Sequence, residues 1–204
     1  MTRTREHPVK LRISSGVACG ILLVACATRP TTPPQHAWKQ PNDVRIAGVK
    51  NFEIVSERIW RGAQPTAEGF HSLERLGVKT VLNLRSDHDD LPLLIGTDLK
   101  YLRVPMYAWD PDQGQVAQLV LVMATLDRLR RDPQRSPVFV HCAAGRDRTG
   151  YTIAAYRMIF ENWSANDAIE EMFDFRFNTV FFRNPEFLRR LDVREIRRRL
   201  AKAP

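Results

Sequence analysis

The sequence predicts an α/β domain in which a central sheet is flanked by helices. Short apolar segments of strand-like composition alternate with longer segments in which apolar residues recur at helical spacing. Turn and cap residues separate these segments, and the chain of 204 residues, 44% of them hydrophobic, is long enough for one ordinary domain. We expect this domain to occupy residues 44–204.

The first half of the domain is expected to hold three strands and one helix. The break Arg61-Gly62-Ala63-Gln64-Pro65 ends the first strand, because Gly and Pro interrupt regular structure. Thr66 can cap the helix that follows, and Gly77 stands at its other end. The expected elements are a strand at 52–60, a helix at 66–76, and strands at 78–84 and 100–106.

The second half is expected to be mostly helical. Pro133 and Pro137 close its first helix, and Ser164 can cap a later one. A short apolar strand leads directly into His141 and Cys142. The expected elements are a helix at 115–131, a strand at 138–140, and helices at 148–161, 164–172 and 185–202.

Charge and cysteine content exclude several classes of protein. The formal net charge is +8, of which the first 25 residues carry +3 and the remainder +5. That modest excess does not indicate a nucleic-acid binder, but it favours anionic small substrates or anionic lipid surfaces. The three cysteines, at positions 19, 26 and 142, are too few for a disulfide scaffold or a Cys-rich zinc module.

The N-terminus has the pattern of an export signal. Residues 1–12 are basic, and the uncharged apolar run at 13–25 is shorter than the ~20 residues needed to span a bilayer. Leu23-Val24-Ala25-Cys26 resembles the bacterial lipobox, which implies cleavage before Cys26 and lipidation of its thiol. We therefore expect a lipoprotein signal peptide at 1–25; a plain signal peptide with an incidental Cys is the alternative.

Residues 26–43 are expected to form the lipidated Cys26 and a Pro-rich extended tether. The chain would then be exported and lipid-anchored on the periplasmic side of a bacterial membrane. Ala27, the residue after Cys26, favours the outer membrane. Because Cys19 would leave with the signal peptide, Cys142 would be the only free thiol of the mature protein, as expected of a reactive one.

The segment at 141–150, His-Cys-Ala-Ala-Gly-Arg-Asp-Arg-Thr-Gly, points most directly to chemistry. Five residues separate Cys142 from Arg148, which is enough to curl a loop around one tetrahedral anion. The backbone N–H groups that begin at Ala143 can point inward, and Gly145 permits a close approach that a Cβ would block. A helix that starts near Arg148 would present its positive end to the anion.

These residues predict a nucleophilic site for a phosphate ester. Arg148 offers a planar fork to two phosphate oxygens, and the positive field favours Cys142 as the thiolate nucleophile. Thr149 could donate a hydrogen bond to the sulfur and help it leave in a second step, whereas His141 is expected to brace the loop. The expected substrate-binding residues are Ala143, Ala144, Gly145, Arg146 and Thr149.

The segment resembles the signature loop of cysteine-dependent tyrosine and dual-specificity phosphatases, in which a Cys, five residues, an Arg and Thr-Gly follow a strand. Residues 59–65 and 81–85 resemble upstream elements of bacterial, plant and fungal atypical dual-specificity phosphatases, and residues 163–172 resemble the bacterial branch. The resemblance implies a tyrosine/dual-specificity phosphatase-like fold and, with the lipobox, a bacterial lipoprotein branch of that family. It also implies a phosphocysteine intermediate that water later hydrolyses, with no metal and no other cofactor.

One departure from the family pattern concerns the general acid. Typical tyrosine phosphatases carry an acid Asp in a Trp-Pro-Asp sequence, whereas the corresponding stretch here reads Trp109-Asp110-Pro111-Asp112. Asp147 resembles the loop Asp of myotubularins and some bacterial lipid phosphatases. We expect Asp147 to protonate the leaving oxygen, with Asp110 as the alternative acid, and a purely structural role for Asp147 stays open.

The leading functional hypothesis is a phosphatase of tyrosine-phosphorylated or dual-specificity protein substrates. Arg146, Asp147 and membrane proximity motivate an alternative substrate: a phosphoinositide, an inositol phosphate or another phospholipid. A phosphate-binding module without turnover would be expected to lack Cys142 or Arg148, and both are present. The expected partners are a phosphorylated substrate and, through the anchor, a membrane, but no nucleic acid.

Overall fold

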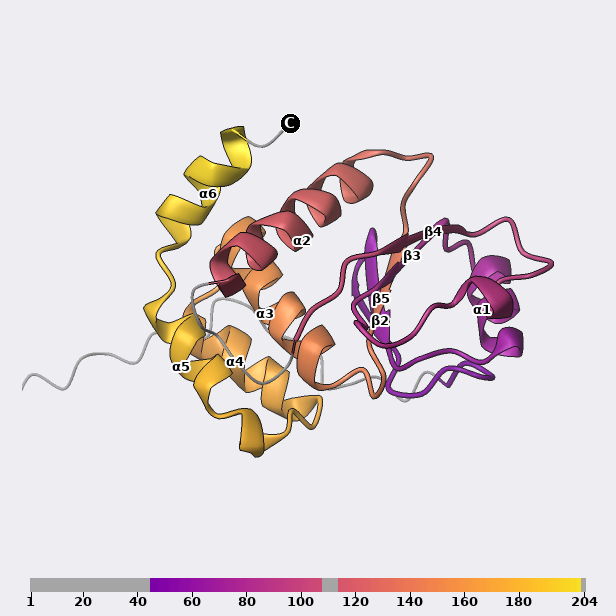
Figure 1. Cartoon of the computed structure of the whole chain (residues 1–204), viewed down its shortest axis with the longest axis horizontal. Coiled ribbons are helices and arrows are strands. Elements are labelled where there is room, and N and C mark those ends of the chain that lie inside the picture. The colour runs from indigo at the N-terminus through magenta and orange to yellow at the C-terminus, as the bar shows by residue number, and fades with distance from the viewer. Residues whose placement is uncertain (1–44, 108–113, 203–204) are drawn as a thin grey trace, which may run out of the picture. The chain divides into compact units, whose positions relative to one another are not determined.

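The structure, a computed structural model, describes residues 45–107 and 114–202, so the predicted signal peptide and tether, with Cys26, and Asp110 lie outside the described residues. The α/β class with a central sheet and flanking helices is confirmed (Figure 1). The elements are β1 (Glu53–Ser56), β2 (Ile59–Gly62), α1 (Ala67–Arg75), β3 (Thr80–Asn83), η1 (Leu91–Leu93), β4 (Lys100–Arg103), α2 (Gly114–Arg131), β5 (Val138–His141), α3 (Asp147–Phe160), α4 (Ala165–Asp174), η2 (Thr179–Phe181), α5 (Arg183–Arg190) and α6 (Val193–Lys202). Among these helices, none has the length and apolar character needed to cross a membrane.

The five strands lie in the order β1-β2-β5-β3-β4, and β5 is at the centre. All neighbouring pairs are parallel except β1 with β2, which are antiparallel. At the ends of the three middle strands, Gly62, His141 and Asn83 lie in register. Cys142 therefore emerges at the carboxyl edge of the sheet, where open parallel sheets place their ligand sites.

Helices cover both faces of the sheet, with α1 on one side of the strands and α2 and α3 on the other (Figure 1). Successive side chains of a strand point to opposite faces, and β5 is buried on both. Phe139 and His141 face Phe70 of α1, whereas Val140 and Cys142 join the core formed with α2 and α3. His141 therefore packs on the α1 side of the sheet, whereas the neighbouring Cys142 packs on the side of α2 and α3.

The prediction of one strand over 52–60 is wrong, because the chain reverses within it to form β1 and β2. The Ser56 hydroxyl accepts hydrogen bonds from the backbone N–H groups of Arg58 and Ile59, at 3.4 and 3.2 Å, and so stabilises a tight turn. Ile54 then pairs with Trp60 across the antiparallel ladder. The Ser56 side chain thus stabilises the turn by accepting from backbone N–H groups, and the sequence contains no Gly or Pro there that would have predicted a turn.

The prediction of one helix over 185–202 is also wrong, because α5 and α6 are separate helices. Leu191 has the extended dihedrals φ −63° and ψ 120°, which end α5. The Asp192 carboxylate accepts a hydrogen bond from the backbone N–H of Glu195 at 3.0 Å, so this Asp caps a new helix. The cap restarts the helix after two non-helical residues, Leu191 and Asp192, which the continuous polar pattern did not reveal.

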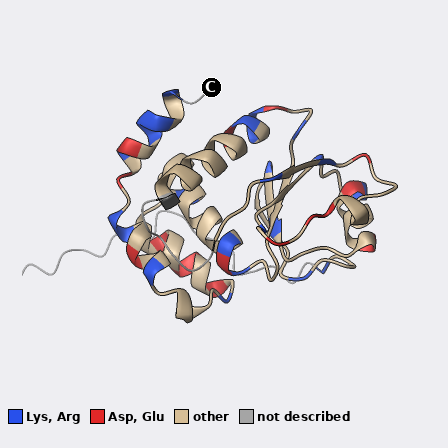
Figure 2. Cartoon of the chain, in the orientation of Figure 1, with Lys and Arg blue, Asp and Glu red and all other residues tan. Residues whose placement is uncertain are grey.

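Other local predictions agree with the structure. The Thr66 hydroxyl accepts a hydrogen bond from Gly69 N at 3.1 Å, and the Ser164 hydroxyl accepts one from Asp167 N at 3.1 Å, as expected of N-caps. Basic side chains gather along α6 and near the end of α2 (Figure 2). Part of that charge is balanced within α6, where Glu195 pairs with two arginines of the following turn.

Candidate active site

The loop at 142–148 joins the end of β5 to the start of α3. Cys142 is only 2% exposed at the base of the loop, and the Arg148 side chain is partly exposed in the first turn of the helix. Helix α3 begins at Asp147, and the first backbone N–H groups of a helix have no intrahelical acceptor. The loop therefore ends on the positive end of a 14-residue helix, close to the thiol.

The carbonyl groups of this loop are turned outward, toward the segment around β1 and β2. The backbone N–H of Gln64 donates a hydrogen bond to the Ala143 carbonyl at 3.1 Å. The carbonyl of Gly145 accepts hydrogen bonds from Asn51 Nδ2 at 3.0 Å and from Arg61 Nη2 at 2.9 Å. Because the C=O and N–H of a trans peptide point in opposite directions, these contacts turn the amides of Ala144 and Arg146 inward, to the side on which an anion would bind.

Gly145 is the position at which this loop requires glycine. Its φ is +67°, in the left-handed region, and a Cβ built on it would lie 2.4 Å from the carbonyl carbon of Gly62 and 2.5 Å from the nitrogen of Ala63. The end of β2 thus touches the loop backbone directly. This contact sets the curvature that the sequence predicted from the presence of a glycine there.

Arg61 supplies a buried positive charge on the α3–α4 side of the loop. Its guanidinium is 1% exposed, lies 3.9 Å from the centre of the Phe175 ring and donates to the loop. Burial lowers the pKa of Arg61 to about 10, while the negative charges of Glu171 and of Cys142 oppose that shift. Arg61 therefore stays cationic at neutral pH, within the electrostatic range of the nucleophile candidate.

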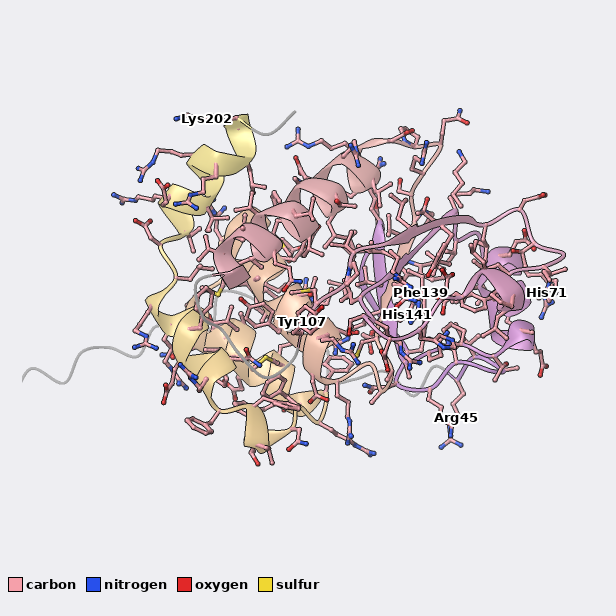
Figure 3. All side chains as sticks on the ribbon, viewed as in Figure 1. Arg45, His71, Tyr107, Phe139, His141 and Lys202 are labelled. Atoms are coloured by element: carbon pink, nitrogen blue, oxygen red, sulfur yellow. The ribbon has the colours of Figure 1, made fainter. Side chains whose placement is uncertain are left out.

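His141 lies on the opposite side of the loop, against the α1 layer. Its Nε2 is 2.8 Å from Asp90 Oδ2, and its Nδ1 is 3.3 Å from the carbonyl oxygen of Cys142. The imidazole stacks on Phe139, with ring centres 5.8 Å apart, and both residues are labelled in Figure 3. These contacts fix the ring at the base of the loop, where it can brace the backbone.

Arg148 and Thr149, both predicted to act on the phosphate group, lie in the first turn of α3. Arg148 Nη1 is 3.8 Å from Asp87 Oδ1, a loose ion pair at the rim of the site. The hydrogen bond from Arg85 lowers the pKa of Asp87, and the charge of Arg148 adds to that effect. The Thr149 hydroxyl is fully buried and has no hydrogen-bond partner among the described residues, which leaves it free for a ligand or for the sulfur.

Of the two candidate general acids, only Asp147 lies within the described residues. The Asp147 carboxylate accepts a hydrogen bond from the backbone N–H of Asn178 at 2.9 Å, which ties the start of α3 to the segment before η2. Asp110 lies within the undescribed residues 108–113, directly after the exposed Tyr107. The assignment of the acid to Asp147 stays a prediction.

Three residues that form hydrogen bonds to the loop or to His141 were missed by the sequence analysis: Asn51, Gln64 and Asp90. Asn51 has a positive φ of 51°, and nothing in its local sequence distinguishes it from a turn residue. Asp90 belongs to the run Ser-Asp-His-Asp-Asp, which has the composition of a solvated surface loop. Its complete burial depends on partners far away in the sequence.

Comparisons with known proteins agree with this geometry. Residues 47–204 match the tyrosine phosphatase family. The dual specificity protein phosphatase TpbA of Pseudomonas aeruginosa is 33% identical over 150 residues, which are 74% of this chain and 63% of that protein. The inositol diphosphatase SIW14 of Saccharomyces cerevisiae is 29% identical over 153 residues, 73% of this chain and 53% of that protein. The chain thus spans less than two thirds of the length of these curated relatives.

Solved structures give the same result. The crystal structure of P. aeruginosa TpbA aligns with a TM-score of 0.68 at 31% identity, over 82% of this chain and 98% of that chain. A cysteine-to-serine variant of TpbA in complex with phosphotyrosine aligns with the same TM-score at 29% identity, over 79% of this chain and 96% of that chain. From the family match and the fold that carries it, we conclude that the chain belongs to the tyrosine phosphatase family.

Proposed function

We propose that this protein is a cysteine-dependent phosphatase that hydrolyses phosphomonoesters of proteins, with phosphotyrosine as the principal substrate and dual specificity. One observation carries the proposal: the loop at 142–148 turns the carbonyls of Ala143 and Gly145 outward, which leaves its amides free to bind one anion beside a buried thiol and an arginine. The family membership supports the reaction class, and the relative in complex with phosphotyrosine supports the substrate.

The first chemical step forms a bond between Cys142 Sγ and phosphorus while the bond from phosphorus to the ester oxygen breaks. The loop amides and the planar fork of Arg148 bind the non-bridging oxygens and stabilise the charge on them as the step proceeds. The leaving oxygen takes a proton from the general acid and departs as an alcohol or phenol. Holding the thiolate near phosphorus removes most of the entropic cost of the encounter.

The second step releases the enzyme from the phosphocysteine intermediate. Water attacks phosphorus, the S–P bond breaks, and its electron pair returns to Cys142 as the thiolate. The proton that water loses goes to the carboxylate that acted as the acid before. The buried Thr149 hydroxyl supports this step by donating a hydrogen bond to the departing sulfur.

The Cys142→Ser variant tests this mechanism. Turnover of p-nitrophenyl phosphate should be lost because an alcohol is a far weaker nucleophile than a thiolate, while phosphate binding should persist because the amides and Arg148 remain. Binding is measured by isothermal titration with inorganic phosphate. Full activity of this variant, or activity that requires an added metal, contradicts the mechanism.

We assign the general acid to Asp147. Its Oδ1 accepts the N–H of Asn178, which holds the carboxyl group in place and leaves Oδ2 to carry the transferable proton. An acid matters most when the leaving oxygen is a poor leaving group. Asp147→Asn should therefore slow phosphotyrosine hydrolysis much more than p-nitrophenyl phosphate hydrolysis; equal losses would indicate a structural role, and selectivity in Asp110→Asn would move the assignment there.

An inositol phosphate or phosphoinositide is the second candidate substrate. The similarity to SIW14 favours it, as does Arg146, which directly precedes α3 beside the loop, makes no capping hydrogen bond with its side chain and could contact a second phosphate. A panel of phosphotyrosine and phosphoserine peptides, inositol phosphates and phosphoinositides discriminates between the candidates. The highest kcat/KM on phosphotyrosine supports the main proposal, whereas a preference for an inositol phosphate that Arg146→Ala removes would replace it.

We further propose that the chain is exported and lipid-anchored through Cys26 on the periplasmic side of a bacterial outer membrane. The basic start, the short apolar run and the Leu-Val-Ala-Cys sequence support this proposal. Metabolic labelling with a fatty acid should mark the wild-type chain but not the Cys26→Ser variant. Equal labelling of both would refute the lipid anchor.

A further inference from the structure

We propose that Asp90 is a positioning residue for the nucleophile, because it holds His141 as an imidazolium cation at the base of the loop, next to Cys142. The inference rests on the proposed function only in taking Cys142 as the nucleophile. A buried carboxylate on the segment between β3 and η1 would then influence the reactivity of a thiol that it does not touch.

Asp90 is completely buried, and its carboxylate has two close partners. Oδ2 is 2.8 Å from His141 Nε2, and Oδ1 accepts a hydrogen bond from Gln64 Nε2 at 2.8 Å. His88 lies further off, with its Nε2 at 3.6 Å from Oδ1 and about one third exposed. A buried carboxylate needs a counter-charge, and two imidazoles of the described residues face it: that of His141 at hydrogen-bond distance, and that of His88, whose Nε2 is buried without a hydrogen-bond partner.

The backbone of Asp90 is fixed as well. Its N–H donates to the Tyr101 hydroxyl at 3.3 Å, and that hydroxyl also accepts a hydrogen bond from Asn83 Nδ2 at 3.1 Å. Asn83 ends β3 directly beside His141, which ends β5. The backbone at Asp90 is therefore anchored through β3 and β4, and the hydrogen bond from Gln64 Nε2 holds the carboxylate itself.

The protonation state of His141 follows from its two neighbours. Nε2 faces a carboxylate oxygen and Nδ1 faces the carbonyl oxygen of Cys142, so both ring nitrogens face hydrogen-bond acceptors. A neutral imidazole carries one N–H and would direct a lone pair at one of these oxygens, whereas the imidazolium donates to both. The ring lies against Phe70 and Phe139, and this apolar setting strengthens its attraction to Asp90.

The orientation of the pair decides its effect on the thiol. The cationic ring lies between Asp90 and the backbone of Cys142, so the nearer charge is positive. The other charged groups around the nucleophile are Arg61 from β2, which feels the charges of Cys142 and Glu171, and Arg148 at the end of the loop. Asp90 acts only through His141 in this arrangement, and loss of its charge should leave the ring neutral and the thiolate less favoured.

The imidazolium can be detected in the wild-type protein without any turnover. Nitrogen-15 spectra of the full chain, labelled at histidine and assigned with His141→Gln, should show both ring nitrogens of His141 protonated at neutral pH. A neutral tautomer of His141 at neutral pH would overturn the proposal. Because this readout needs neither substrate nor a variant of Asp90, it separates failure of this inference from failure of the proposed function.

Alkylation of Cys142 by iodoacetamide reports the thiolate directly. In Asp90→Asn, the midpoint of the pH–rate profile should move upward by about one unit, which is a roughly tenfold slower reaction below the midpoint. Asp89→Asn is the matched control: Asp89 is exposed and 3.8 Å from Arg103, so its profile should match wild type. An unshifted midpoint in a folded Asp90→Asn protein contradicts the proposal.

A double-mutant cycle tests whether the effect passes through His141. His141→Gln alone should move the midpoint upward, and adding Asp90→Asn to it should produce no further shift. An additional shift of the full size would mean that Asp90 acts on the site by another route, through Gln64 for example, and would refute the proposed relay. Thermal unfolding of each variant identifies any protein that has failed to fold.

Discussion

Replacement of Gly145 by Ala tests how the end of β2 shapes the loop. The added methyl group would lie 2.4 Å from the Gly62 carbonyl carbon and 2.5 Å from Ala63 N, and both are backbone atoms that cannot rotate away. The residue also keeps a φ of +67°. The substitution therefore combines a strained dihedral with a collision between two segments that the site requires in contact.

The two effects have different magnitudes and different readouts. The left-handed dihedral alone costs about 1–2 kcal/mol of stability. To reach ordinary van der Waals separation the loop must move about 1 Å from β2. A misplacement of about 1 Å in a catalytic group can cost about 100-fold in rate, so kcat/KM should fall by about that factor.

Gly77→Ala is the matched control, because Gly77 has a φ of +99° and a methyl group added there would meet no atom within 4 Å. The Gly77→Ala variant should have a lower free energy of unfolding in urea but keep the wild-type kcat/KM on p-nitrophenyl phosphate. If Gly145→Ala loses stability as Gly77→Ala does and also keeps wild-type kcat/KM, the contact with β2 does not shape the catalytic loop and the reasoning fails.

Three further substitutions probe the surroundings of the site. Arg61→Met removes the buried charge and the hydrogen bond to the loop, and kcat/KM on p-nitrophenyl phosphate should fall about 10-fold, since hydrogen bonds from charged groups contribute about 1.5–3 kcal/mol; an unchanged value would remove Arg61 from the site. Glu171→Gln removes one of two carboxylates that pair with Arg157, at 2.7 Å, while Glu161 stays at 2.6 Å, and urea unfolding should show a loss of about 2 kcal/mol; a loss near zero would contradict the pairing. Asp87→Asn removes a carboxylate that competes for Arg148, so inorganic phosphate should inhibit up to about 3-fold more strongly, whereas weaker inhibition would mean that Asp87 orients the arginine.

The sequence was sufficient for the fold class and for the loop, because both are encoded by local patterns. The spacing from Cys142 to Thr149, placed between a strand and a helix, is a local motif, and its arrangement in space follows from the parallel sheet. The turn between β1 and β2 was missed because a serine side chain formed it. The cap at Asp192 was missed because the polar pattern around it was continuous.

The support of the loop could not be predicted, because it comes from long-range contacts. Asn51 and Asp90 lie 94 and 51 positions from their partners at Gly145 and His141. Polar residues of these types are mostly exposed in proteins, so composition alone places them on the surface. Only the pairing of β2 and β3 with β5 brings their segments to one edge of the sheet.

The two buried cations beside Cys142 approach it from opposite faces of the sheet. Arg61 lies on the α3–α4 side, where the charges of Glu171 and Cys142 favour its protonated form, while the Glu171 carboxylate itself pairs with Arg157. His141 lies on the α1 side, with Asp90 at its Nε2. Burial lowers the pKa of Arg61 only to about 10, so its charge at neutral pH does not depend on a paired carboxylate, whereas the charge proposed for His141 depends on Asp90. Loss of Asp90 should therefore weaken the thiolate in part and leave the charge of Arg61 in place.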